Sequence, residues 1–455
     1  MRRLLPGLTL GLILLVGLAL RIVNNDYGLP FVYSIDEGSH FTDRAVLMFR
    51  EGIDPGYYQN PAAYTYLVYV LLRVLYGPLQ VLVDLPFGNV TDQFDKDPTQ
   101  IWIAARTLAA VLCMAGVLAV WWTARRLWGA RESLVAAAVL SFAFLPVAYS
   151  RVAVTDVGVL AGVALALLFA VLAYEHGRLR DYALAGAAAG LAIAFKYTAG
   201  LVLLPLGIAA LARLRRDRLR TLAGLGLAAA LAGVVFVVLN PYLLGSFDSW
   251  WHDLRGQAEV AADQPKPGQE SGGLSYYLRS LTWGLGWAGC LAAAIGAVVE
   301  LRRDVVRGLM LLALPLALLL YLSLQSRYFG RWLLPAYPAL ALLAGVAIVR
   351  VADALAAKRP RHSALLAGAL AAALTALVLA QPFAADVRTA LMLGRTDTRE
   401  QARDFLVDNY PPGLRVSIEP AVPGRWYRTN PSGRDPAQLT RCARRADWTE
   451  PGWSY

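Results

Sequence analysis

The sequence predicts an all-α protein that crosses a membrane many times, and three observations support this fold class. Hydrophobic residues make up 57% of the 455-residue chain and charged residues only 16%, whereas about a quarter of a typical soluble protein is charged. The apolar residues gather in runs close to the roughly 20 residues that a membrane-spanning helix needs. The arginines stand mainly in short loops between these runs.

Eleven apolar runs are predicted as membrane-spanning helices. They cover residues 4–23, 101–122, 134–149, 157–174, 182–196, 199–212, 221–240, 281–299, 309–323, 332–349 and 363–380. The first run follows Arg2 and Arg3 and has a second interpretation as a signal peptide. We favour a span, because no small-residue cleavage pattern follows this run and further apolar runs do.

Loop charges predict the orientation of these helices. A cytoplasmic N-terminus places most arginines in inner loops, as the positive-inside rule requires, while the outer segments hold far fewer cations. The inner cations are Arg125, Arg126, Arg131, Arg178, Arg180, Arg213, Arg215, Arg216, Arg218, Arg220, Arg302, Arg303, Arg307, Arg350, Lys358, Arg359 and Arg361. The net charge of +11 therefore reflects membrane topology and does not indicate a nucleic-acid partner.

We expect two parts, a transmembrane catalytic domain over residues 1–380 and a small extracytoplasmic C-terminal segment over residues 381–455. In the outer loop 24–100, Phe41–Phe49 and Ala62–Tyr76 predict helices along the membrane surface, because tyrosines favour that interface. The alternative is that the second helix spans the membrane, which would reverse every later loop. The tail "TREQARDFLVDNYPPGLRVSIEP" predicts an amphipathic helix that ends at Pro-Pro-Gly, followed by a short strand.

Familiar motifs for nucleotide or zinc chemistry are missing from the sequence. Its three cysteines, Cys113, Cys290 and Cys442, have no spacing that indicates a metal cluster or a disulfide framework. Any chemistry must therefore come mainly from carboxylates, arginine, lysine and tyrosine.

Four short stretches place charged side chains at the predicted outer ends of the spans. They are "VYSIDEGSHF" with Asp36 and Glu37, "YSRVAVTDVGVL" with Arg151 and Asp156, "AIAFKYTAGLVLLP" with Lys196, and "LQSRYFGRWLLPAYP" with Arg327, Tyr328 and Arg331. Charges at the membrane are costly and are functional candidates by default. Carboxylates can accept a proton from a hydroxyl, and arginine forks suit phosphate.

Each stretch also has a structural interpretation. The acids of the first stretch could be solvated loop residues, and Asp156 could cap a helix. Lys196 could extend to the surface, and Arg327 and Arg331 could be ordinary interfacial anchors. Taken together, the four stretches predict one outer pocket that combines acids for proton transfer with cations for a phosphate, beside a wall open to lipid.

These motifs resemble those of the membrane-embedded GT-C glycosyltransferases, especially bacterial relatives of protein O-mannosyltransferases and of the lipid A aminoarabinose transferase. The likeness rests on "DEGSHF", "QNPAAYTYLVYVLLRVLYG", "SRVAVTD" and "FKYTAGLVLLP", and it extends over most of residues 1–420. The sequence departs from the family at Pro61-Ala62, where the family has two prolines, and at Asn60, where it has histidine. Any contact made by that histidine is therefore in doubt.

The resemblance implies a GT-C bundle and an inverting, one-step sugar transfer from a polyprenyl-phosphate donor to an acceptor hydroxyl. It implies a multi-pass protein of the bacterial plasma membrane with its active site outside. By position, Asp36 would be the general base, and Glu37 and Asp156 would shape the acceptor and sugar side of the pocket. The implied donor-phosphate residues are Lys196 with Arg327 or Arg331, and the implied pocket residues are His40, Tyr58, Asn60, Arg151 and Tyr328.

The sequence leaves several partners open. No cofactor is implied with certainty, but some relatives use a divalent metal, which His40 and the acids could bind. The sugar is not specified, and the acceptor could be a protein, a lipid or a cell-wall glycan. The main alternative is a transporter, flippase or polymerase of polyprenyl-linked glycans, which would more often place charges at mid-span depth. A scaffolding membrane protein would not need Asp36, Asp156 and Lys196 to converge.

Overall fold

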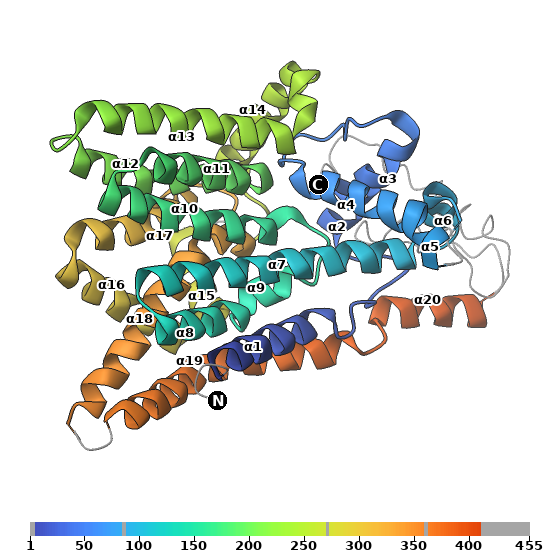
Figure 1. Cartoon of the computed structure of the whole chain (residues 1–455). Coiled ribbons are helices and arrows are strands. Elements are labelled where there is room, and N and C mark those ends of the chain that lie inside the picture. The colour runs from blue at the N-terminus through green and yellow to red at the C-terminus, as the bar shows by residue number, and fades with distance from the viewer. Residues whose placement is uncertain (1–4, 84–87, 270–272, 359–362, 411–455) are drawn as a thin grey trace.

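The computed structural model describes residues 5–83, 88–269, 273–358 and 363–410 (Figure 1). In these ranges every regular element is a helix, in agreement with the predicted fold class. Long apolar helices run side by side in one bundle, and α1 (Leu5–Ile22) lies along α19 (Ser363–Leu393) on one side of it (Figure 1).

The bundle contains a helix for each of the eleven predicted runs. Besides α1 and α19, its helices are α7 (Thr99–Leu127), α8 (Ala130–Ser141), α9 (Phe144–Tyr149), α10 (Val159–His176), α11 (Leu179–Phe195), α12 (Leu203–Arg213), α13 (Arg218–Leu239), α15 (Gly273–Gly284), α16 (Trp287–Arg303), α17 (Val305–Ser323) and α18 (Tyr337–Ala356). Among the described residues, seven helices are long and apolar enough to cross a membrane, or eight if one bent pair is counted as a span. The chain is a multi-pass membrane protein.

Three predicted runs differ from the helices that form. The run 281–299 is broken between α15 and α16, which meet at 102°, so the prediction of one straight span was wrong here. Gly286 makes this bend with a φ of 86°, a left-handed value that favours glycine. The run 134–149 is divided between α8 and α9. The last helix continues past residue 380 to Leu393, so the expected domain boundary falls inside α19.

Residues 24–83 and 88–98 form a cap of short helices at one end of the bundle (Figure 1). Its elements are α2 (Ile35–His40), α3 (Thr42–Glu51), α4 (Ala63–Val74), the π-helical turn η1 (Leu75–Leu79), α5 (Gln80–Val83) and α6 (Val90–Lys96). The cap begins and ends at the same end of the bundle, because Arg106 of α7 donates a 2.8 Å hydrogen bond to the Asn25 carbonyl.

Because the cap begins and ends at the same end of the bundle, the structure bears on whether α4 spans the membrane. Together with η1 and α5, α4 is long and apolar enough to do so. The backbone amide of Ala62 donates to Asn240 Oδ1 at 2.6 Å, and the Tyr64 hydroxyl donates to the Ala105 carbonyl at 2.7 Å. Both contacts hold the start of α4 against the cap end of the bundle. A single crossing by α4 would leave the chain at the wrong end for α7, so the geometry favours the surface-helix interpretation.

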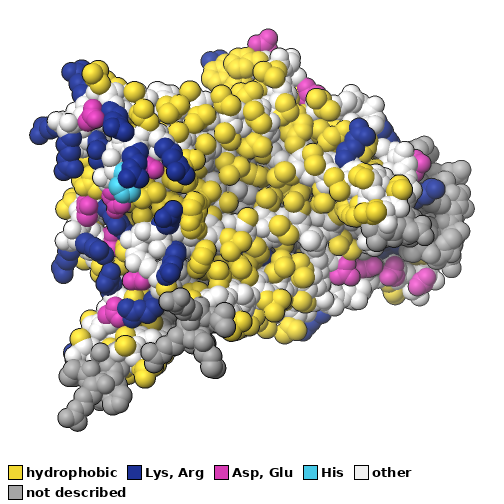
Figure 2. Space-filling model, viewed as in Figure 1, with side chains coloured by type: hydrophobic (Ala, Val, Ile, Leu, Met, Phe, Trp, Pro, Cys, Tyr) yellow, Lys and Arg dark blue, Asp and Glu magenta, His cyan; other side chains and the backbone are white. Residues whose placement is uncertain are grey.

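Two further helices lie at the cap end. The helix predicted in the tail is α20 (Thr398–Asn409), whose N-cap Asp397 accepts a hydrogen bond from the Arg399 amide. The strand predicted after it lies outside the described residues. The amphipathic helix α14 (Phe247–Asp263) connects two spans and was not predicted. Lysine and arginine side chains gather at the opposite end, beyond an uncharged hydrophobic band (Figure 2).

Small residues allow the closest approach between helices α11 and α13. A Cβ atom added at Gly186 would overlap the backbone of Ala228, and one added at Gly190 would overlap Ala232. Such contacts are how membrane helices pack without a hydrophobic driving force between them.

We predict that Gly186→Leu lowers the free energy of unfolding of the detergent-solubilised protein by about 1–3 kcal/mol, because α11 must move away from α13. The melting temperature should fall accordingly. The matched control is Gly233→Leu on α13, where an added Cβ meets nothing within 4 Å. Thermal unfolding followed by size-exclusion chromatography measures the difference. Equal melting temperatures for the two variants would contradict the packing argument.

Candidate functional site

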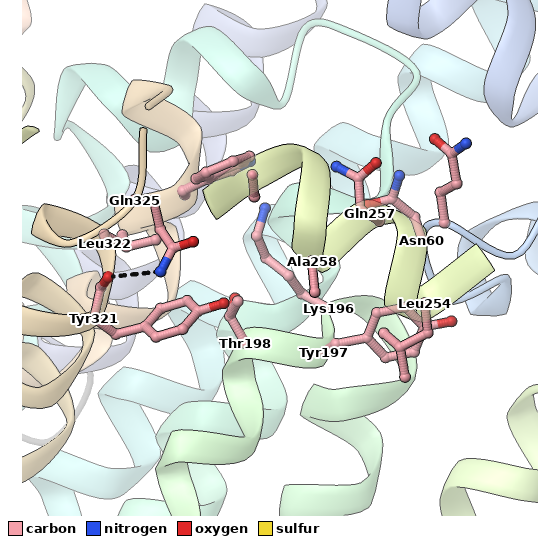
Figure 3. Close-up of a pocket in the computed structure, with 13 residues that line it drawn as sticks. Asn60, Lys196, Tyr197, Thr198, Leu254, Gln257, Ala258, Tyr321, Leu322 and Gln325 are labelled. Atoms are coloured by element: carbon pink, nitrogen blue, oxygen red, sulfur yellow. Dashed lines mark hydrogen bonds between the residues drawn. The ribbon is translucent and has the colours of Figure 1, made fainter. Parts of the chain in front are cut away.

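A cleft opens at the cap end of the bundle (Figure 3). Its lining comes from four parts of the chain: the loop before α4, the segment after α11, helix α14, and the end of α17 with the following 3₁₀ helix η5 (Gly330–Ala336). The lining residues are Gln59, Asn60, Lys196, Tyr197, Thr198, Leu254, Gln257, Ala258, Ala261, Tyr321, Leu322, Gln325 and Trp332. Amide, hydroxyl and aromatic groups therefore surround one lysine.

The backbone explains why Lys196 reaches this cleft. Helix α11 ends at Phe195, and Lys196 has an extended conformation before the 3₁₀ helix η3 (Tyr197–Val202) begins. This break turns the lysine away from the apolar helix surface. Its side chain is 9% exposed, and it forms a buried ion pair with Asp156.

Asp156 belongs to a chain of four alternating charges. Arg331 Nε lies 3.8 Å from the second oxygen of Asp156, and Arg331 Nη2 lies 2.7 Å from Asp36 Oδ2. The order is thus Lys196, Asp156, Arg331 and Asp36, and we call these four side chains the charge relay cluster. They come from the end of α11, the 3₁₀ helix η2 (Thr155–Gly158), η5 and α2. The structure brings together four of the seven charged residues that the sequence analysis placed in one pocket, whereas Glu37, Arg151 and Arg327 lie elsewhere.

Exposure differs along the charge relay cluster. The Asp156 side chain is 6% exposed, whereas Asp36 is 39% exposed and Arg331 is 20% exposed. The acid that could meet a substrate hydroxyl is therefore Asp36, since Asp156 is enclosed between two cations.

Aromatic groups border Asp36. His40 Nδ1 lies 3.7 Å from Asp36 Oδ1, and the imidazole stacks on the Tyr57 ring with centroids 4.8 Å apart. Asn60 Nδ2 donates to the Tyr57 hydroxyl at 2.8 Å. Burial lowers the pKa of His40 below its usual value, against the raising effect of Asp36. His40 is therefore neutral at pH 7 and adds no charge to the site.

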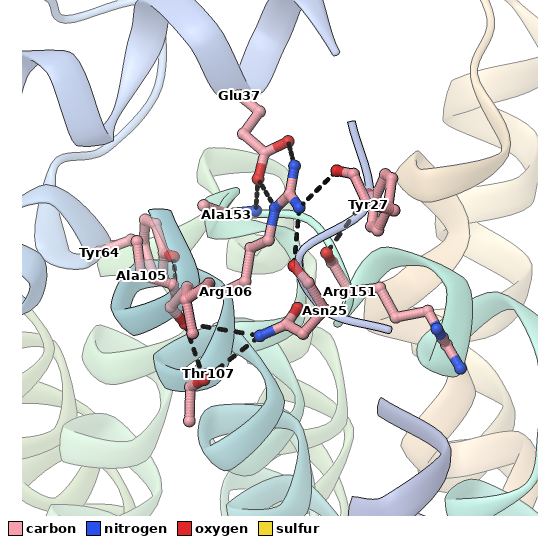
Figure 4. A network of polar contacts seen from close by, with 10 residues as sticks. Asn25, Tyr27, Glu37, Tyr64, Ala105, Arg106, Thr107, Arg151 and Ala153 are labelled. Atoms are coloured by element: carbon pink, nitrogen blue, oxygen red, sulfur yellow. Dashed lines mark hydrogen bonds and ion pairs between the residues drawn. The ribbon is translucent and has the colours of Figure 1, made fainter. Parts of the chain in front are cut away.

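Glu37 does not face the cleft, although it follows Asp36 directly in the chain. Its side chain is fully buried and forms two hydrogen bonds with Arg106, at 2.6 and 3.0 Å (Figure 4). The Ala153 amide also donates to Glu37 Oε1 at 2.9 Å. Arg106 in turn donates to the carbonyls of Asn25 and Tyr27. Glu37 thus joins the loop after α1 and the loop before η2 to α7.

Arg106 is a residue that the sequence analysis missed. An arginine inside the apolar run 101–122 was a visible signal, because a buried cation requires an acid partner. Its guanidinium also lies 4.2 Å from the centroid of the Tyr27 ring, which adds a cation–π contact.

The other predicted pocket residues take structural positions. Arg151 is buried and donates to the carbonyls of Leu20 and Val23, so it caps the C-terminal end of α1. Arg327 donates through Nε to the Gln264 carbonyl at 2.6 Å, just beyond the end of α14. Neither residue lines the cleft.

Tyr58 and Tyr328 are also absent from the lining of the cleft. The Tyr58 hydroxyl donates to Asp54 at 2.6 Å, and the Tyr58 carbonyl accepts from Tyr197 at 3.0 Å. Tyr328 is buried and packs on the Tyr276 ring, with centroids 4.6 Å apart. Asn60, in contrast, lines the cleft as predicted by position.

The described residues do not fit a divalent metal at this site. Among them, no group of three or more His, Cys, Asp and Glu side chains converges as a metal would require. Asp36 and His40 supply two candidate ligands, and the Arg331 guanidinium already occupies one face of that carboxylate. No step of the chemistry is therefore assigned to a metal.

Comparisons with known proteins place this geometry in a known fold. Residues 100–242 match the family model described as dolichyl-phosphate-mannose-protein mannosyltransferase, and no curated protein sequence matches significantly. ArnT from Cupriavidus metallidurans, solved bound to undecaprenyl phosphate, superposes with a TM-score of 0.58 at 16% identity, over 95% of this chain and 87% of that chain. The chain has the GT-C fold.

A second solved structure supports the same fold. The oligosaccharyltransferase AglB from Archaeoglobus fulgidus, in complex with an inhibitory peptide and a dolichol-phosphate, has a TM-score of 0.58 at 14% identity. The match covers 93% of this chain but only 61% of AglB. Both structures confirm the predicted GT-C fold, and the family model adds a match over residues 100–242.

We predict that Glu37→Gln destabilises the folded protein by about 3–5 kcal/mol, because it leaves the buried Arg106 charge uncompensated. Arg106→Leu should cost a similar amount, and the double variant should cost less than the sum of the two. Thermal unfolding in detergent measures all three. Strictly additive losses would mean that the two side chains do not act as a pair.

Proposed function

We propose that the chain is an inverting glycosyltransferase that moves a sugar from a polyprenyl phosphate to an acceptor hydroxyl at the outer face of a bacterial plasma membrane. The observation that carries this proposal is the charge relay cluster, which sets an accessible carboxylate 2.7 Å from an arginine, next to the lysine that lines the cleft. The GT-C fold and the family match supply the reaction class.

Lys196 and Arg331 are assigned to the donor phosphate. Lys196 lines the cleft, and Arg331 is linked to Lys196 through their shared partner Asp156, so the phosphate is assigned to the side of the cleft where these two cations stand. Fixed cations stabilise the negative charge that develops on the leaving phosphate. The complexes of ArnT with undecaprenyl phosphate and of AglB with a dolichol-phosphate support a lipid-linked donor of this kind. Arg327 is already engaged at the end of α14 and is not needed for this role.

Asp36 is assigned as the general base. In one displacement, the acceptor oxygen bonds to the sugar C1 while the bond from C1 to the phosphate oxygen breaks, and Asp36 takes the hydroxyl proton. A single displacement inverts the configuration at C1. Asp36 suits this role because it is the acid of the charge relay cluster with the most exposed side chain.

The cleft lining suits a sugar. Gln257 and Gln325 face each other across it with Lys196 between them (Figure 3). Amide groups both donate and accept hydrogen bonds, which matches sugar hydroxyls. Trp332 and Tyr321 add aromatic surface to the same lining.

The charge distribution supports an outward-facing site. The arginine-rich end of the bundle is opposite the cap that carries Asp36 (Figure 2), and the positive-inside rule assigns an arginine-rich end to the cytoplasm. A donor that has crossed the membrane would then meet an acceptor outside. The acceptor class, whether protein, lipid or glycan, is left to experiment.

A transporter, flippase or polymerase of polyprenyl-linked glycans is the second candidate. The charge relay cluster lies at the cap end, whereas a transporter site is expected near the midplane. We therefore rank transfer above transport.

We predict that Asp36→Asn reduces sugar transfer by about 10²- to 10⁴-fold, the usual contribution of a general base. The control is Asp26→Asn, an exposed acid in the same loop, which should leave transfer unchanged. The assay follows radiolabelled sugars from polyprenyl phosphates in membranes that contain equal amounts of each folded variant. Undiminished transfer by Asp36→Asn would remove this residue from the reaction, and movement of the lipid without transfer would favour the flippase.

We predict that Arg331→Gln weakens donor binding at least tenfold, since a phosphate loses one of its two cations. Gln325→Ala, which removes an uncharged lining group assigned to the sugar, should change the affinity for a lipid phosphate without a sugar far less. Titration of the purified variants with undecaprenyl phosphate gives both affinities. Equal affinities for wild type and Arg331→Gln would refute the assignment of the phosphate to this arginine.

A further inference from the structure

We propose that the C-terminal helix α20 positions the general base, by holding the loop before α2 through Arg399 and Arg403. This inference rests on the proposed function, because it takes Asp36 as the base. It assigns a role to a segment that lies more than 350 residues from Asp36 in the sequence.

The loop between α1 and α2 contains backbone that needs external support. Val32 has a φ of 53° and Asn24 a φ of 56°, both in the left-handed region. For a β-branched residue such as Val32 this conformation is strained, and strained backbone persists only where its surroundings hold it. Val32 lies four residues before Asp36 and is buried.

One side of this loop is held by the pair already described, since Arg106 donates to the carbonyls of Asn25 and Tyr27. The other side faces α19 and α20. Asn24 Nδ2 donates to the Ala390 carbonyl at 2.9 Å. The loop is thus enclosed between α7 and the last two helices of the described chain (Figure 1).

Two arginines of α20 contact the aromatic residues on either side of Val32. The Arg399 guanidinium carbon lies 3.7 Å from the centroid of the Tyr33 ring, and that of Arg403 lies 5.2 Å from the Phe31 ring. Such cation–π contacts contribute more when they are shielded from water. Arg403 is only 2% exposed. Arg399 is oriented by two hydrogen bonds that its guanidinium donates to the Asp397 carboxylate.

The contact between Tyr33 and Arg399 is made by the tyrosine ring and not by its hydroxyl group. This oxygen is buried without a hydrogen-bond partner in the described structure, and burial raises the Tyr33 pKa to about 12. The ring face is therefore the part of Tyr33 that α20 uses. A phenylalanine at this position would keep that face.

A shift in residues 31–33 would be transmitted to the base. The Ser34 carbonyl accepts the Gly38 amide at 2.9 Å, which starts α2, and a Cβ at Gly38 would lie 3.6 Å from the Val32 side chain. Asp36 lies between these contacts. We expect the donor-phosphate site to change little when α20 is released, because Lys196 and Arg331 belong to other elements and Arg331 keeps its second partner, Asp156.

The test compares Arg399→Ala, Arg403→Ala and the double variant with wild type in the full chain. We expect kcat for sugar transfer to fall between about tenfold and a hundredfold in the double variant, the usual cost of a misplaced catalytic group. The KM for the donor should change less than twofold. Tyr33→Phe should behave as wild type, and Arg395→Ala, an exposed arginine beside α20, controls for lost charge.

Hydrogen exchange of the peptide that covers residues 31–37 supplies a readout that does not depend on activity. We expect faster exchange there in the double variant, with unchanged exchange in α11 and η5. Unchanged exchange at residues 31–37, or a donor KM that rises as kcat falls, would overturn the proposal. If wild type transfers no sugar but the exchange pattern is as expected, the proposed function fails and the positioning by α20 stands.

Discussion

The cap depends on one buried ion pair, that between Glu37 and Arg106. Neither side chain is more than 1% exposed, so both charges have lost their water. Removing charges from water is costly, and only close geometry with additional hydrogen bonds offsets that cost. The pair has both, since the Ala153 amide and two loop carbonyls complete its hydrogen bonds. Because these partners come from three segments, the pair fixes the loop after α1, the loop before η2 and the start of α7 together.

This constraint explains why two acids stand side by side in "DEGSHF". Successive residues on a helix point about 100° apart, so α2 directs its two carboxylates to different places. Glu37 points into the protein and anchors the helix, while Asp36 points towards Arg331. This anchor holds α2 on the side of α7, and α20 holds the loop before it on the other side. We regard the second acid as the support of the first, and not as a second group of the pocket.

The sequence predicted those parts of the structure that follow from the distribution of apolar and charged residues along the chain. It located a helix for every apolar run and placed Asp36, Asp156, Lys196 and Arg331 together, because charges at span ends are rare and visible. It could not separate the roles of Asp36 and Glu37, since hydropathy gives no direction for a side chain. It also missed α14, whose two faces cancel in the mean hydropathy, and the bend at Gly286, which depends on a single backbone angle.

The charge balance of the cluster fits the proposed reaction. Two acids and two cations give no net charge, and His40 is neutral at pH 7, so the cluster is neutral before the donor binds. During transfer, the phosphate oxygen gains a negative charge as its bond to the sugar breaks. The proton that passes to Asp36 removes a negative charge from the same cluster at the same step. The total charge of the site therefore stays constant, and Arg331, which no longer faces an ionised Asp36, is free to stabilise the leaving phosphate.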